Sequence, residues 1–214
     1  MYKRKGKPRI PLPAPLWAGL PLLDITRRVN RLGFDLLLQI SANEDARRNC
    51  AAVFDHLGLW AQIDARACER AARCPFLLMD LHFLRVEWWQ LAGLGGAPLQ
   101  LNAPRPLFTD VEGAPILREI LAEAWRMARS TPRAASLLFG MAPAVSEAIA
   151  KLSVPDVDRI VSEHAKHLRP RWEESRTFWS RLLQAAIGTD DDALTGVHLH
   201  SLGLLGGEYV PRQL

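Results

Sequence analysis

The stretch AVSEAIAKLSVPDVDRIVSEHAKHL, residues 144–168, carries the clearest local structural signal in the chain. Its first nine residues predict a short helix. Ser153 can begin a second helix, because its side chain can accept from the backbone N–H of Asp156 while Asp156 reaches back to Ser153. Pro155 is tolerated in a first helical turn. The two helices predict a helix-turn-helix shape, which is also common in proteins that never bind DNA.

The order of elements around this stretch recurs in the first half of the chain. In both halves a long apolar helical run precedes a shorter run and a glycine, namely residues 36–40, 51–54 and Gly58, then residues 120–125, 134–139 and Gly140. About two helical turns after Gly140 have no counterpart in the first half. The pattern favours an internal repeat, with chance similarity between helices as the alternative.

Glycine and proline mark the boundary between the two halves. Residues 93–106 hold three of each and cannot sustain a helix or an interior strand. We therefore expect a basic, proline-rich arm at 1–23, a shortened first repeat at 24–92, a linker at 93–113, a second repeat at 114–205 and a tail at 206–214.

Composition excludes several classes of protein. With 214 residues, 49% apolar and 23% charged, the chain is typical of globular proteins and unlike disordered or fibrous ones. Its uncharged stretches are interrupted by proline and glycine, so we expect neither a membrane span nor a secretory signal. We expect the protein to be located in the bacterial cytoplasm. The three cysteines form no CxxC pair, which predicts free thiols rather than disulfides or a zinc site.

The net charge of +4 is concentrated at the N-terminus. Five of the 27 basic residues lie among the first nine residues, which hold no acid, so the remaining 22 basic and 23 acidic residues nearly cancel. This arm could contact DNA phosphates or serve as a solubilising tail. Its basic residues are Lys3, Arg4, Lys5, Lys7 and Arg9.

The apolar motifs of both halves resemble those of the FlhD family, the subunits that partner FlhC in activators of flagellar genes. The resemblance covers about residues 30–205. It is carried by ASLLF (135–139) with Gly140-Met141, AKLSVP (150–155), DDAL (191–194) with His198, LLLQ (36–39), Phe54 with Leu57-Gly58, and LLM (77–79) with Phe83.

The resemblance implies an all-α, mainly helical fold of two tandem FlhD-like repeats. FlhD-type subunits pair, so the two copies are expected to form a pseudo-dimer within the chain, or the chain a homo-oligomer. It also implies that the protein activates transcription on double-stranded promoter DNA together with an FlhC-like partner. RNA polymerase would be a further partner, and any zinc would be bound by the FlhC-like subunit. Related activators occur on conjugative mobile elements. The first copy departs from the family, since no helix matches residues 144–152 and no final helix is evident.

Two groups of basic residues are candidates for DNA contact, alongside the arm. Arg126, Arg129 and Arg133 recur at helical spacing, with Arg118 two turns earlier, although a solvated helix face is the common alternative. The second group lies on and after the second helix of the helix-turn-helix candidate, where nearby glutamates favour the alternative: Arg159, Lys166, Arg169 and Arg171.

The aromatic residues and histidines are the candidates for partner binding and metal binding. Four tryptophans, Trp88, Trp89, Trp172 and Trp179, are candidates for binding a partner, with core packing as the alternative. Residues 76–86 are apolar enough for a strand, which the pattern leaves open. His164 and His167 share a helical face, but no third ligand completes a metal site, so none is expected.

No catalytic motif is present in the sequence. It contains no GxSxG, Walker or GxGxxG pattern and no nucleophile beside a His and acid pair. We therefore expect a non-enzymatic protein with no cofactor of its own. The alternative to the activator hypothesis is that the protein makes no contact with DNA and serves as a protein-interaction, scaffold or accessory factor of a mobile element.

Overall fold

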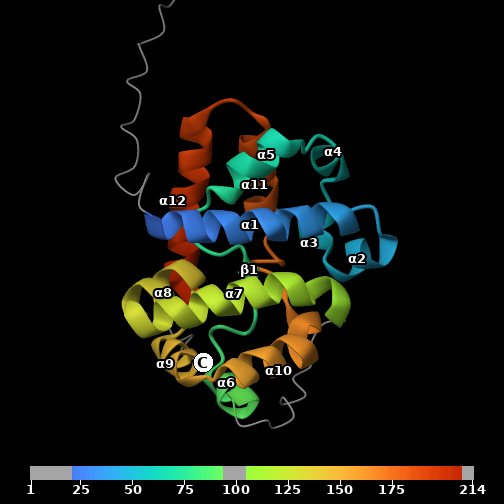
Figure 1. Ribbon diagram of the computed structural model, residues 1–214. Helices are drawn as coiled ribbons and strands as arrows, with labels where there is room; N and C mark the ends of the chain where they lie inside the picture. Colours follow the sequence, from blue (N-terminus) through green and yellow to red (C-terminus); the bar gives the residue numbers. More distant parts are fainter. Residues whose placement is uncertain (1–20, 94–104, 209–214) are drawn as a thin grey trace, which may run out of the picture.

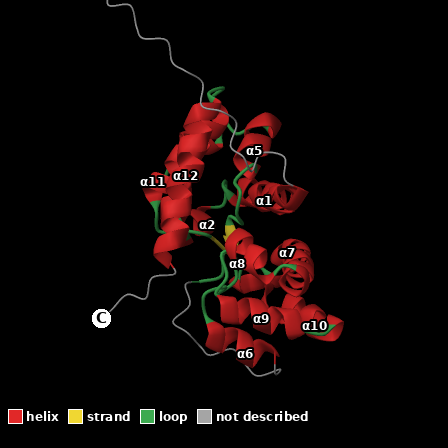
Figure 2. Cartoon of the chain, turned by 90° about the vertical axis from the view of Figure 1, so that its left-hand side faces the viewer, coloured by secondary structure: helices red, strands yellow, loops and turns green. Residues whose placement is uncertain are grey.

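The computed structural model describes residues 21–93 and 105–208, and this part of the chain is mainly helical (Figures 1 and 2). The all-α expectation is confirmed. The first half contains α1 (Pro21–Ile40), α2 (Glu44–Asn49), α3 (Ala51–Phe54), α4 (Leu57–Trp60), α5 (Ala65–Ala72), β1 (Met79–Asp80) and α6 (Val86–Gly93). The second contains α7 (Asp110–Ser130), α8 (Pro132–Phe139), α9 (Pro143–Lys151), α10 (Val154–His164), the 3-10 helix η1 (Ala165–His167), β2 (Arg169–Pro170), α11 (Arg176–Ile187) and α12 (Asp191–Glu208).

The two longest helices of the two halves, α1 and α7, lie side by side across the middle of the molecule (Figure 1). A capping box begins α7, in which the Thr109 side chain accepts from the Glu112 backbone N–H and the Glu112 carboxylate accepts from that of Thr109. Gly113 lets α7 approach η1 closely, because a Cβ there would lie 2.7 Å from the Ala165 carbonyl oxygen. The N-terminus of α7 is therefore held by local sequence and by packing together.

A two-stranded antiparallel ladder joins the halves between these helices. Met79 pairs with Pro170 and Asp80 with Arg169. The backbone N–H of Arg171 extends the pairing by donating to Leu78 at 2.7 Å. Of residues 76–86, which the sequence left open between helix and strand, only Met79–Asp80 form a strand. The ladder places residues that are 89 and 91 positions apart in the chain next to one another.

Beyond the ladder, each half contributes a helix to the other half. Helix α11 of the second half packs against α3, α4 and α5 of the first, and α6 of the first half packs against α9 of the second. The buried apolar side chains of both halves form one continuous hydrophobic core. All three cysteines, Cys50, Cys68 and Cys74, are free and buried, as expected.

Matched positions after the two strands share an unusual backbone. His82 and Trp172 both have φ of 51°, and they are the only non-glycine residues with positive φ in the described ranges. Such a conformation is uncommon for residues with a side chain. Seven residues further on, the indole N–H of Trp89 donates to the His82 carbonyl at 3.2 Å, and that of Trp179 donates to the Arg171 carbonyl at 3.1 Å.

Ion pairs on the long helices also recur. Arg31 of α1 lies 3.7 Å from the carboxylate of Glu69 on α5, and Arg118 of α7 forms an ion pair with Asp158 on α10. Helices α5 and α10 occupy matching places in the order of elements. In each half, therefore, a residue with positive φ follows the strand, a tryptophan indole donates to the backbone, and the long helix forms an ion pair with a later helix.

The expected boundaries need adjustment. Helix α1 begins inside the expected arm, α7 begins inside the expected linker, and α12 continues into the expected tail. In the first half, α4 lies between α3 and α5, where no helix was expected, and α6 follows β1 as α11 follows β2, whereas the structure describes no first-half helix that matches α12. Helices α4 and α6 were missed because they are only one or two turns long and carry weak periodicity. None of the helices in residues 21–93 and 105–208 has both the length and the apolar character that crossing a bilayer requires.

Candidate nucleic-acid interface

The end of α7 and the first turn of α8 carry three of the predicted basic residues on the surface. Arg126, Arg129 and Arg133 are all exposed. The Arg126 guanidinium lies 2.7 Å from the Glu123 carboxylate, and that of Arg129 lies over the Trp125 ring, 4.8 Å from its centroid. Stacking on an aromatic ring holds a guanidinium in a defined place while leaving its N–H groups open to a ligand.

Trp125 brings a fourth basic residue to this place. Its indole N–H donates to the Leu152 carbonyl at 2.8 Å, which joins α7 to the end of α9. Lys151, in the last turn of α9, is exposed beside this contact. The sequence analysis overlooked Lys151, because only tertiary packing brings it near the arginines. We call these four residues the α7–α9 basic surface: Arg126, Arg129, Arg133 and Lys151.

Acidic side chains limit the charge of this surface. The Glu123 carboxylate, which contacts Arg126, also lies 2.6 Å from the Arg28 guanidinium of α1. Arg118, earlier on α7, is paired with Asp158. Arg129, Arg133 and Lys151 are therefore the stronger candidates for contact with an anion.

Two consecutive short helices, α9 and α10, lie at the predicted place, and each packs against α7. The capping box is confirmed: the Asp156 backbone N–H donates to the Ser153 hydroxyl at 3.4 Å, and the Ser153 N–H donates to the Asp156 carboxylate at 2.9 Å. The Ser153 hydroxyl also donates to the Asp156 carboxylate, and this hydrogen bond, together with that from the Ser153 backbone N–H, lowers the pKa of Asp156 below its usual value.

The exposed face of α10 does not suit a recognition helix. Its exposed residues are Val154, Pro155, Asp158, Ser162 and Glu163, so its exposed charged side chains are both acidic. Arg159 is half-buried and bonded to Asp156 at 3.2 Å. A DNA phosphate would meet negative charge on this helix, which opposes binding.

Two other predicted DNA contacts are wrong. Arg169 and Arg171 are buried at the ladder, with 9% and 3% of their surface exposed. The Arg169 guanidinium donates to the carbonyls of Arg105 and Asn49 and to the Glu173 carboxylate. Both arginines stabilise backbone carbonyl groups inside the protein, so neither can reach DNA.

Arg171 stabilises the turn that follows α8. Its guanidinium donates to the Phe139 carbonyl at 2.8 Å and lies 3.4 Å from the Asp80 carboxylate. Lys166, from the same predicted group, is half-buried, and its ammonium lies 3.6 Å from the Asp110 carboxylate. It helps to anchor η1 to the start of α7.

The prediction that four tryptophans bind a partner is also wrong. Trp88, Trp89, Trp172 and Trp179 have exposed fractions of 7% or less and pack in the core. The Trp179 ring, for example, lies 6.5 Å from that of Trp60, centroid to centroid. The core-packing alternative was correct for all four. The predicted arm contacts, Lys3, Arg4, Lys5, Lys7 and Arg9, lie outside the described residues.

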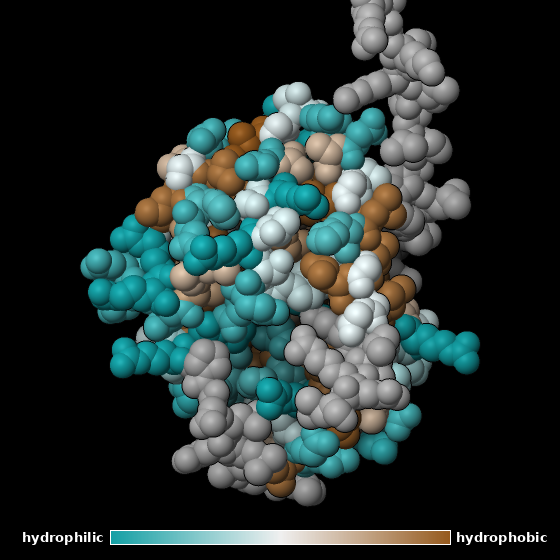
Figure 3. Space-filling view, turned by 180° about the vertical axis from the view of Figure 1, so that it is seen from behind, coloured by the Kyte–Doolittle hydropathy of each residue, from teal (hydrophilic) through white to brown (hydrophobic). Residues whose placement is uncertain are grey.

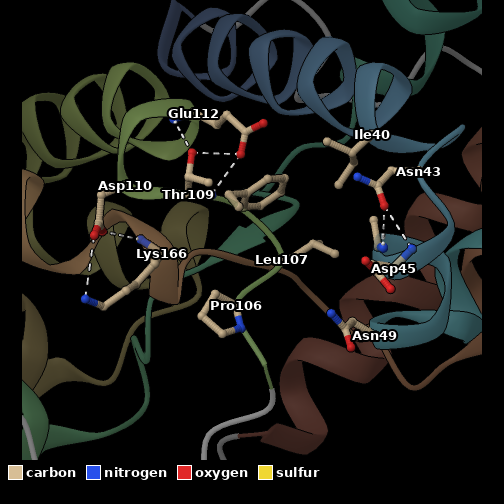
Figure 4. Close-up of a pocket in the computed structure, with 12 residues that line it drawn as sticks. Ile40, Asn43, Asp45, Asn49, Pro106, Leu107, Thr109, Asp110, Glu112 and Lys166 are labelled. Atoms are coloured by element: carbon tan, nitrogen blue, oxygen red, sulfur yellow. Dashed lines mark hydrogen bonds and ion pairs between the residues drawn. The ribbon is translucent and has the colours of Figure 1, made fainter.

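Figure 4 shows a surface cavity of about 540 Å³ between α2 and the start of α7. Its polar side chains already have partners within the protein. Asn43 accepts from the Asp45 backbone N–H at 2.8 Å, and Asp110 accepts from that of Lys166 at 3.0 Å. Ligand sites need converging polar groups that are open to the ligand. This cavity serves to join helix caps and does not resemble a binding site.

The surface seen from behind mixes polar and apolar residues, with apolar ones gathered on the right, where α12 lies (Figure 3). Leu199 of α12 is 52% exposed. Within the described residues, no three His, Cys, Asp or Glu side chains lie close enough together to hold a metal ion. The exposed basic corner formed by α7, α8 and α9 is therefore the best candidate site.

No protein-family model, curated protein or solved structure matches the chain.

Proposed function

We propose that the protein is an FlhD-like subunit of a DNA-associated complex that activates transcription together with an FlhC-like partner. The observation that carries this proposal is the α7–α9 basic surface, whose four basic side chains are exposed on three adjoining helices. Arginine and lysine on helix ends are well suited to phosphate oxygens. The basic N-terminal arm would add contacts that need no fixed geometry.

The same surface supports phosphate contact rather than base reading. Helix α10 exposes Asp158 and Glu163, and base recognition in a groove needs side chains that can approach the phosphates on either side. Sequence specificity would therefore come from the partner. We expect weak binding to DNA by the protein alone and strong, salt-sensitive binding with the partner.

We further propose that the two halves are copies of one unit, fused as a pseudo-dimer. Hydrogen bonds on either side of the ladder support this, because Trp89 and Trp179, which are 90 residues apart, both donate their indole N–H to a backbone carbonyl seven or eight residues earlier. The shared positive φ of His82 and Trp172 points the same way. A fused dimer removes the concentration dependence of pairing.

The test measures binding of a promoter fragment at two salt concentrations, with the protein alone and with the FlhC-like product encoded nearest its gene. One variant replaces Arg126, Arg129, Arg133 and Lys151 by Gln. A control variant carries four Gln at exposed arginines elsewhere, namely Arg48, Arg66, Arg176 and Arg181.

The basic-surface variant should bind DNA more weakly, and its logarithmic salt dependence should flatten by about 0.9 for each phosphate that the protein no longer neutralises. The control should flatten less. Equal effects of the two variants would show that net charge matters and this surface does not. Absence of any partner-dependent shift would remove the proposal.

The competing function is that of a scaffold or accessory protein of a mobile element. The acidic exposed face of α10 and the exposed Leu199 of α12 favour it, since neither suits DNA. It predicts that the partner co-purifies with the protein without shifting DNA. It also predicts that the basic-surface variant stays fully active.

A further inference from the structure

Three histidines and a tryptophan meet where α6 of the first half contacts the second half. His82 precedes α6, His164 ends α10 and His167 lies in η1. The His167 ring lies 6.0 Å from the His82 ring and 5.9 Å from the His164 ring, centroid to centroid. The Trp88 ring of α6 lies 5.4 Å from His82 and 5.1 Å from His164. We call these four residues the α6 histidine cluster.

His164 is the most constrained member of this cluster. Its side chain is 3% exposed, and neither ring nitrogen has a hydrogen-bond partner among the described residues. The Glu163 carboxylate is 3.9 Å from Nε2, which is beyond hydrogen-bond distance. A neutral imidazole is costly in such a place, and a charged one is costlier still.

The surrounding charges do not compensate for burial. Burial lowers the pKa of all three histidines below the usual value. Nearby acids oppose this and nearby bases reinforce it, and the groups that act on the cluster are Asp80, Arg85, Asp110, Arg159, Glu163 and Lys166. His167 and His82 also act on one another, since a charge on either opposes a charge on the other.

We propose that the α6 histidine cluster is an acid-sensitive latch that holds α6 against α9 and α10 at neutral pH and releases it on acidification. Protonating His167 together with His82 or His164 would place like charges about 6 Å apart at a partly buried contact. Release of α6 would expose Trp88 and Trp89, which are buried in the docked state.

The direction of the pH dependence follows from linkage. Because folding lowers the pKa of these histidines, the released state binds protons more readily than the docked state. Docking is therefore fully favourable above about pH 6.5, the ordinary histidine pKa, and weakens as the pH falls below it. Each unit by which one pKa is lowered changes the ratio of released to docked protein by up to roughly tenfold.

The experiment uses the full chain labelled with 5-fluorotryptophan, followed by ¹⁹F NMR from pH 7.5 to pH 5. The Trp88→Phe spectrum identifies the Trp88 resonance. We expect this resonance to move toward a solvent-exposed position as the pH falls, while that of Trp60, buried in the first half, stays constant. Burial also lowers the pKa of His198 of α12 to about 4, so protonation of His198 would destabilise the whole fold over the same pH range, and the Trp60 resonance reports that effect.

Variants separate the latch from general acid unfolding. His164→Phe with His167→Phe keeps both rings and leaves His82 as the only member of the cluster that can be protonated, so the Trp88 transition should move below pH 5. His200→Phe, at an exposed position on α12, should leave it unchanged. If the double variant does not fold, His167→Gln at the half-buried position should move the transition to lower pH.

Three outcomes would overturn the proposal. The Trp88 resonance could stay constant to pH 5, or its transition could persist in the ring-preserving variant. Alternatively, Trp60 could change at the same pH as Trp88, which would show unfolding of the whole molecule rather than release of α6.

Discussion

Individual arginines in this protein stabilise backbone carbonyl groups more often than the sequence suggested. Arg70 donates to the carbonyls of Ala185, Ala186 and Asp190 near the end of α11, and Arg169 and Arg171 do the same around the ladder. A guanidinium has five donors and can satisfy several carbonyls at once, whereas water cannot reach these buried groups. In the sequence, a buried arginine of this kind cannot be distinguished from an exposed arginine that contacts DNA, because both are the same residue type.

Arg171→Met should destabilise the fold by about 3 kcal/mol, because it leaves the Phe139 and Gly140 carbonyls and the Asp80 carboxylate without this partner. Urea denaturation followed by circular dichroism measures the decrease in stability. Arg126→Met, at an exposed site, should change stability by no more than about 0.5 kcal/mol. Equal decreases in the two variants would contradict the role given to Arg171.

Gly140→Ala should also be destabilising, for a different reason. Gly140 ends α8 with φ of +58°, which costs a residue with a Cβ about 1–2 kcal/mol, and the new methyl would collide with the Arg171 guanidinium. Gly58→Ala offers a matched control, since no atom lies within 4 Å of the added Cβ in helix α4. There alanine should stabilise by up to about 1 kcal/mol. A neutral Gly140→Ala in chemical denaturation would argue against the strain.

At the scale of elements, the boundary between α9 and α10 was predictable because it is encoded locally. The side chains of Ser153 and Asp156 accept from one another's backbone N–H groups, and Pro155 has no N–H to satisfy, so this first turn of α10 depends little on distant residues. The short helices of the first half were not predictable in the same way. Helix α4 has a single turn and no side-chain cap, so its position depends on packing around Trp60.

Ser153→Ala should cost about 1 kcal/mol of stability, the usual effect of removing a capping side chain. Thermal unfolding can detect this change. Ser162→Ala, whose hydroxyl is exposed within the same helix, serves as the control and should change stability by about a few tenths of a kcal/mol. If both serines proved equal, the cap would not contribute to the stability of α10.

At the scale of the whole molecule, the two halves depend on one another. The strands pair across the halves, α6 and α11 are exchanged between them, and one core includes residues from both. A half on its own would expose the apolar surfaces that the other half covers, and that exposure costs roughly 25 cal/mol for each Å².

A protease site inserted between Gly95 and Gly96 tests this dependence. After cleavage, the two fragments should stay together in size-exclusion chromatography and unfold in a single transition. The uncut protein with the same insertion is the control. Fragments that separate under native conditions would show that each half folds independently.

The glycine- and proline-rich boundary, the free cysteines and the cap of α10 were predictable from the sequence, because each depends on residue content or on residues close together in the chain, and the helical class was expected from the resemblance to the FlhD family. Only the tertiary structure decided which basic residues are exposed. Arg129 and Lys151 meet through Trp125, whereas Arg169 and Arg171 are enclosed by carbonyl groups from both halves. Burial is set by contacts between residues far apart in sequence, so local patterns cannot distinguish a charged side chain that faces solvent from one that supports the core.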